Sequence, residues 1–136
     1  MKPKIKHKSI KSLKKTCWKW FSLYRRLLYA DKNGMVRCVT CGVRKHYKEI
    51  QASHFVDGRG NAVLFNEDLV YPACYRCNVC LHGNKVKYTL FMLTKHSPEE
   101  IKYFESLRYK VRKFTVAELE EKIKVYKAEV KRLKKC

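Results

Sequence analysis

Acidic residues are scarce in this sequence: 12 aspartates and glutamates stand against 32 lysines and arginines, giving a net charge of +20. This excess is larger than solubility requires and predicts a polyanionic partner. No apolar run approaches the roughly 18 residues of a transmembrane helix, and the basic N-terminus lacks the apolar segment of a signal peptide. We therefore expect a protein that stays in the cytoplasm, has no membrane partner and binds nucleic acid.

The chain has too few hydrophobic residues to form a large core. Its 136 residues suggest one domain, and its 46% of hydrophobic residues allow only a modest core. Small cores often need a staple such as a structural metal. The 7 cysteines are candidates for this role, because CxxC pairs without a secretion signal indicate reduced thiols rather than disulfides.

Two CxxC pairs frame the central part of the chain. The first is Cys38-Val-Thr-Cys41 and the second is Cys74-Tyr-Arg-Cys77. Four thiolates in such pairs typically hold one tetrahedral Zn²⁺. The segment between the pairs is longer than the about 15–20 residues of a simple zinc ribbon, so the metal would staple a larger insert. A shifted set that uses Cys80, which follows Cys77 at the same spacing, stays open.

Three helices are expected outside the central segment. Apolar residues at steps of three and four predict a helix over residues 12–30 and place Cys17 on its buried face. Ser97 and Thr115 each precede a glutamate at the capping-box spacing, which predicts two further helices. The last helix carries an apolar seam at heptad spacing, and its packing on its own domain or on a second copy stays open. The seam consists of Leu119, Ile123, Tyr126, Val130 and Leu133.

The central segment is expected to contain strands and one helix. Residues 35–39 and 47–52 have the composition of short strands, and residues 62–65 are expected to form the second arm of a hairpin. Residues 77–94 are expected to be helical, with an interruption near Gly83. The fold class that follows is α+β.

The chain is expected to divide into three parts. Residues 1–11 would form a basic flexible arm, because this stretch is rich in lysine and poor in residues to bury. Residues 12–96 would form the zinc-stapled domain with its N-terminal helix. Residues 97–136 would form a C-terminal helical pair that binds DNA or dimerises.

His54 is the strongest candidate for a catalytic residue. It ends a predicted strand between the two cysteine pairs and precedes a loop that contains two glycines. Phosphodiester hydrolysis needs a general base and a cation near the developing charge. Asn78 and His82 are four residues apart, so on one helix they would share a face and could bind one Mg²⁺. The pattern is typical of a ββα-metal nuclease centre.

Several motifs together resemble known phage nuclease families. The order of Cys38-x-x-Cys41, Ser53-His54 and Cys74-x-x-Cys77-Asn78 is similar to that of the recombination endonuclease VII family. The segments Ser53-His54-Phe55, Leu64-Phe65-Asn66-Glu67-Asp68, Cys77-Asn78 and Gly83-Asn84 resemble the phage NinG (Rap) recombination family more closely.

This resemblance implies a His-Me finger (HNH) endonuclease in a phage-infected bacterial cell. It implies structural zinc on the four cysteines, His54 as the base and Asn78 as a ligand of catalytic Mg²⁺ or Mn²⁺. The implied substrates are branched recombination intermediates, Holliday junctions and D-loops among them, or double-stranded DNA.

Two positions depart from the pattern of the wider HNH group. Ser53 stands where many relatives have an acidic metal ligand, and Leu69 falls near the position of the middle asparagine. The second ligand of the catalytic metal therefore stays open among His82, Asp57 and Asp68. The alternative function is that of a non-catalytic zinc-containing DNA-binding protein.

Arginines near the helix and the cysteine pairs are candidates for binding DNA phosphates, because the guanidinium group can bind a phosphate with two hydrogen bonds. The candidates are Arg25, Arg26, Arg44, Arg59 and Arg76.

Overall fold

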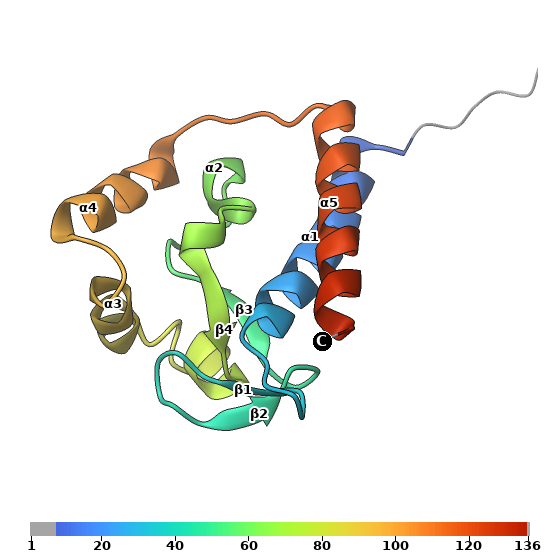
Figure 1. Cartoon of the computed structure of the whole chain (residues 1–136). Coiled ribbons are helices and arrows are strands. Elements are labelled where there is room, and N and C mark those ends of the chain that lie inside the picture. The colour runs from blue at the N-terminus through green and yellow to red at the C-terminus, as the bar shows by residue number, and fades with distance from the viewer. Residues whose placement is uncertain (1–7, 136) are drawn as a thin grey trace, which may run out of the picture.

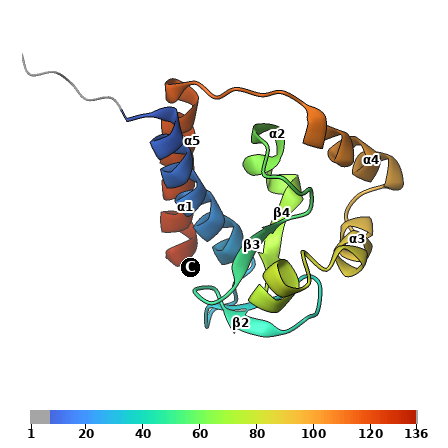
Figure 2. The same cartoon turned by 180° about the vertical axis from the view of Figure 1, so that it is seen from behind.

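The computed structural model describes residues 8–135 and combines helices with two small sheets, which confirms the α+β class. Helices α1 (Ile10–Leu28) and α5 (Val116–Lys134) lie side by side along one flank of the molecule (Figures 1 and 2). Helices α3 (Lys85–Leu93) and α4 (Pro98–Ser106) form the opposite flank. One of the two strand pairs lies between these two helical pairs, and the other lies below them in Figure 1.

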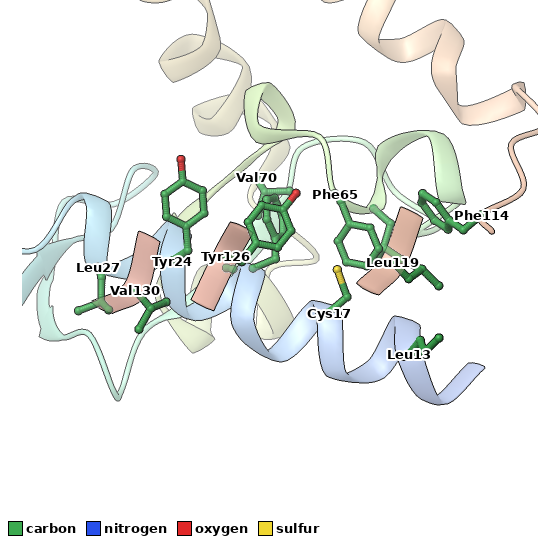
Figure 3. Close-up of a cluster of buried hydrophobic side chains, with 13 residues drawn as sticks. Leu13, Cys17, Tyr24, Leu27, Phe65, Val70, Phe114, Leu119, Tyr126 and Val130 are labelled. Carbon is green, nitrogen blue, oxygen red and sulfur yellow. The ribbon is translucent and has the colours of Figure 1, made fainter. Parts of the chain in front are cut away.

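The α1–α5 pair packs around the largest of the three buried hydrophobic clusters in the described part of the chain. The expected capping boxes are present at Ser97 and Thr115, where each side chain accepts a hydrogen bond from a backbone N–H three residues on. The α5 seam packs onto α1 within the same chain, and Cys17 is fully buried there, as expected (Figure 3). Of the expected basic arm, residues 1–7 lie outside the described part of the chain.

The four strands form two separate antiparallel pairs. Strand β1 (Met35–Arg37) pairs with β2 (Arg44–His46), and the turn between them carries the first cysteine pair. Strand β3 (Gln51–His54) pairs with β4 (Val70–Ala73), so that His54 lies opposite the first residue of β4. The predicted strand over 47–52 thus begins later and ends at the histidine.

The expected strand over 62–65 is wrong, because these residues belong to helix α2 (Asn61–Leu64) and its C-cap. A half-buried strand would bury every second side chain. Here Val63, Leu64 and Phe65 are all buried, with Leu64 and Phe65 in the core beneath α1 and Val63 in a second core against α3 and α4. A helical turn can direct consecutive side chains into two cores, and the second arm of the hairpin is therefore β4.

The expected helix over 77–94 is also corrected. A single π-helical turn, η2 (Arg76–Cys80), is separated from α3 by His82, Gly83 and Asn84, which all have positive φ angles of 50°, 94° and 49°. A right-handed helix cannot continue through three left-handed residues. Asn78 and His82 therefore do not share a helix face.

Two short 3-10 turns complete the fold: η1 (Glu67–Leu69) leads into β4, and η3 (Leu107–Tyr109) follows α4. An extended strap then crosses above α2 to reach α5 (Figures 1 and 2). The Asn61 side chain anchors this strap by donating a 2.8 Å hydrogen bond to the Arg112 carbonyl. No helix within residues 8–135 has the length and apolar character needed to cross a membrane.

Candidate metal centre and active site

The two cysteine pairs converge into one group, which we call the cysteine cluster. It consists of Cys38, Cys41, Cys74 and Cys77, whose sulfur atoms all lie within 4.8 Å of one another. The sulfurs of Cys41 and Cys74 are 3.8 Å apart. A tetrahedron with Zn–S bonds of about 2.3 Å has S···S edges of about 3.8 Å, whereas a disulfide needs about 2.05 Å. The cluster could therefore hold a structural metal such as zinc, and Cys80 is outside it and exposed.

Hydrogen bonds lower the pKa of two of the four thiols in the cysteine cluster, those of Cys38 and Cys77. Burial opposes ionisation of the Cys38 thiol, but hydrogen bonds from backbone N–H groups and the Thr40 hydroxyl outweigh it and lower its pKa to about 6. The Asn84 amide donates to the Cys77 sulfur at 3.5 Å. Burial and neighbouring thiols raise the pKa of Cys74 to about 12. Because metal ions bind thiolates, loading of the cluster would release the protons that remain.

The cluster fixes the strand that carries His54. Cys74 directly follows β4, its backbone N–H donates to the Cys38 sulfur at 3.3 Å, and β4 holds β3 through the antiparallel ladder. His54 stands at the end of β3, where the chain leaves the sheet for the 57–60 loop. A metal in the cluster would thus stabilise the position of the histidine through a single hairpin.

The imidazole of His54 is held through one of its two ring nitrogens. Its Nε2 lies 3.1 Å from the Leu64 carbonyl oxygen, which can only accept, so Nε2 carries the proton and Nδ1 remains free to accept one. Burial of the ring lowers the pKa of His54, and the positive charges of Arg59 and Lys85 act in the same direction. The neutral form, which is the form that can accept a proton, is therefore favoured near pH 7.

Two residues that the sequence did not single out hold this histidine. The Trp18 ring stacks on the His54 ring with 4.9 Å between centroids and 19° between planes, and the Arg59 guanidinium lies 4.7 Å from the Trp18 centroid. Lys85 Nζ donates to the His54 carbonyl at 3.1 Å and pairs with the Asp57 carboxylate at 3.0 Å. Trp18 follows the buried Cys17 in α1 and is only partly buried against the core, so part of its ring is left to contact His54.

The Asn78 side chain is held by two neighbours from β3. Ser53, which is only 1% exposed, donates its hydroxyl to Asn78 Oδ1 at 2.7 Å. The Asn78 amide nitrogen donates to Gln51 Oε1 at 2.7 Å. Because the amide is fixed from both ends, Oδ1 keeps one orientation and retains a second lone pair for a cation.

His54, Asp57 and Asn78 line two adjoining cavities. The larger, of about 510 Å³, extends to Arg59 and to the face of α1 that carries Trp18. The smaller, of about 320 Å³, is completed by residues 79, 82 and 83. His82 thus reaches the site through its left-handed turn rather than through a helix.

The other candidates lie elsewhere. Asp68 is exposed in η1 and lines neither of the two cavities. Arg44 forms a 2.6 Å ion pair with Asp31 at the far hairpin. Arg76 is exposed beside the cysteine cluster. Of the predicted arginines, Arg59 and Arg26 line the larger cavity.

The expectation that Arg25 contacts DNA is corrected by its burial, because the residue is only 4% exposed. Its guanidinium donates to the Val70 carbonyl at 3.0 Å and the Glu67 carbonyl at 2.8 Å. Arg26 is half-buried and donates to the Tyr47 carbonyl at 2.6 Å. Arg25 therefore joins α1 to β4 from within the fold.

The sequence model of a family described as NinG, Bacteriophage Lambda NinG protein, matches residues 1–136, which is the full length of the chain. No curated protein and no solved structure matches the chain.

Proposed function

Because the chain belongs to the bacteriophage lambda NinG family, we propose that it is a zinc-stapled, Mg²⁺- or Mn²⁺-dependent endonuclease for branched recombination DNA. The observation that carries the proposal is that His54, whose Nε2 is held by a carbonyl, and Asn78, whose Oδ1 is held by Ser53, line the same cavity. The order of β3, β4 and the Asn78 turn supports a ββα-metal arrangement. The net charge of +20 supports a polyanionic substrate.

In this proposal His54 takes the proton from the attacking water through Nδ1. The Leu64 carbonyl keeps the proton on Nε2 and fixes the orientation of the imidazole ring. Trp18 and Lys85 hold the ring and the backbone of His54, respectively. Arg59 lines the same cavity and can bind a phosphate oxygen there.

Asn78 would bind the catalytic cation through Oδ1, and a bound Mg²⁺ supplies stabilisation of the charge on the phosphate and leaving oxygen. The helical argument for His82 as the second ligand no longer applies, since Asn78 and His82 share no helix. Mg²⁺ prefers oxygen ligands. Asp57, which lines the same small cavity, is therefore the better candidate for the second ligand.

Single-turnover nicking of a four-way junction tests the assignment. His54→Ala should reduce the rate by about 10²–10⁴-fold, the usual contribution of a general base, while junction affinity stays unchanged because phosphate-binding cations are untouched. His46→Ala is the matched control, since His46 lies in β2 and lines neither cavity. Normal cutting by His54→Ala would refute the centre.

Asn78→Ala tests the cation separately. It should weaken the use of Mg²⁺, so that part of the lost rate returns at high Mg²⁺ or with Mn²⁺, whereas His54→Ala should not respond. A loss that no concentration of either metal relieves would show that Asn78 does not serve the cation.

The alternative is a zinc-containing DNA-binding protein without catalysis. The observation that favours it is Leu69, which is fully buried and cannot bind a metal, together with the serine at position 53. A wild-type protein that binds junctions but does not nick them with Mg²⁺ or Mn²⁺ would support this alternative.

A further inference from the structure

A second basic surface lies on the flank of the α1–α5 pair that faces away from the catalytic cavity. We call it the lysine groove. It has a volume of about 480 Å³ and an apolar floor formed by Trp20 and Val130. Its rim is formed by Lys127, Lys131, Lys134 and Lys135.

The helical geometry of α1 separates this groove from the catalytic cavity. Trp18 lines the catalytic cavity and Trp20 lines the lysine groove. Residues two apart on an α-helix point about 200° from each other around its axis. One nucleic-acid segment in the catalytic cavity therefore cannot occupy the groove by a small shift, because the helix stands between them.

The charge of the groove is left uncompensated. Lys127 Nζ lies 5.3 Å from the centre of the Trp20 ring, and Lys19 Nζ lies 5.6 Å from it. All four rim lysines are exposed, and in the part of the chain that the structure describes none of them forms an ion pair with a carboxylate. Like charges gathered on one helix face repel each other. An anion bound between them would relieve this repulsion.

The spacing of these lysines suits a nucleic-acid backbone rather than a single small anion. Lys127 and Lys135 are eight residues apart, which corresponds to about 12 Å along a helix axis. One DNA strand carries a phosphate for about every 3.4 Å of duplex axis, so the rim spans about three or four phosphates. The half-exposed Trp20 gives the strand an apolar surface beneath the charges.

We propose that the lysine groove binds the phosphate backbone of a second DNA arm, while the catalytic cavity holds the arm to be cut. This inference rests on the proposed branched-DNA substrate. A linear duplex presents one arm and can use either surface alone. A branched molecule can occupy both surfaces, so the groove would favour junctions over duplexes.

The test is a triple variant, Lys127→Gln, Lys131→Gln and Lys134→Gln. Its matched control exchanges three exposed lysines of the opposite flank for glutamine, which gives the same net charge. These are Lys87, Lys102 and Lys110. Affinities for a four-way junction and a linear duplex of equal length are measured by gel shift in Mg²⁺-free buffer. A chelator is left out of the buffer, because it would remove zinc from the cysteine cluster.

The groove variant should bind the junction at least about 10-fold more weakly than the control variant, with a loss of about 2-fold or less on the duplex. Its slope of log K against log salt for the junction should be shallower by about 2.7, at about 0.9 per lost phosphate contact. Equal junction affinities of the two variants would overturn the proposal. An equal loss on junction and duplex would also overturn it, because the groove would then belong to a single binding track.

Two further measurements keep the result clear. Thermal denaturation shows whether the triple variant has a folding defect. If it has one, the single variant Lys131→Gln is used instead, with Lys102→Gln as its control. Lys131→Gln should still weaken junction binding more than duplex binding. Binding is measured without cleavage. A wild-type protein that never nicks DNA, together with a selective loss of junction affinity in the groove variant, would therefore refute the nuclease and leave the groove supported.

Discussion

Replacement of Arg25 by alanine should destabilise the fold strongly and should affect DNA binding little in the molecules that remain folded. Arg25 is 4% exposed, and its guanidinium joins α1 to β4 and to the turn before it through two backbone carbonyls. It also lies within 5.7 Å of the ring centres of Tyr24, Tyr29 and Tyr71. Alanine would leave the buried Val70 carbonyl and the partly buried Glu67 carbonyl without this donor.

The expected loss follows from these contacts. A hydrogen bond from a charged donor contributes about 1.5–3 kcal/mol, so the two bonds together account for about 3–6 kcal/mol. Water that enters the vacated space would offset part of this loss, so we expect a net cost of about 3–5 kcal/mol. For a chain of 136 residues this corresponds to a fall in Tm of about 10–17 °C.

Thermal denaturation of the zinc-loaded protein measures this change. Arg76→Ala is the matched control, because it removes the same charge from an exposed side chain and should leave Tm within about 2 °C. Arg25→Lys should be intermediate, since lysine keeps the charge without the planar fork. An Arg25→Ala protein with an unchanged Tm and weaker DNA binding than Arg76→Ala would refute the structural role.

Four further outcomes are expected. A chelator should remove about one zinc per chain and unfold the domain, as followed by elemental analysis and circular dichroism, while Cys80→Ser should retain its zinc. The single-turnover rate should rise with pH through the pKa of His54, which burial places below 6.5, and then level off. The same shift should reduce folding stability as pH falls below 6.5, because the unfolded chain gains a proton there that the folded chain resists. Lys85→Met should slow nicking more than it weakens binding, because Lys85 Nζ holds the backbone of His54; an unchanged nicking rate would contradict this role.

The features that could be predicted from the sequence depend on neighbours in the chain. The capping boxes at Ser97 and Thr115 need only a residue three positions away, and both formed. The cysteine cluster could be predicted because each CxxC pair places two thiols at the spacing that binds one metal ion. The four sulfur atoms do lie together in the structure. The helix that contains Cys17 follows from an apolar period, although its first turn begins before residue 12.

The features that could not be predicted depend on distant partners. Residues 62–65 are apolar enough for either a strand or a helix, and their place between two cores decides for a helix. His82 adopts a left-handed conformation because the chain must turn from the cysteine cluster into α3. In the sequence Arg25 cannot be told from a surface arginine. Its burial depends on two carbonyls, 42 and 45 residues further along the chain, that accept hydrogen bonds from its guanidinium.

The serine at position 53 would make the proposed catalytic metal site depend on DNA. In place of a carboxylate ligand the site has a buried hydroxyl that orients Asn78, and the Asp57 carboxylate is already paired with Lys85. Mg²⁺ is usually held by one or two carboxylates together with substrate phosphates. We infer that a substrate phosphate must complete this site, so Mn²⁺ should bind weakly to the free protein and more tightly with an uncleavable junction. Equal Mn²⁺ affinity in the two states, measured by paramagnetic titration, would show that the protein alone completes the site.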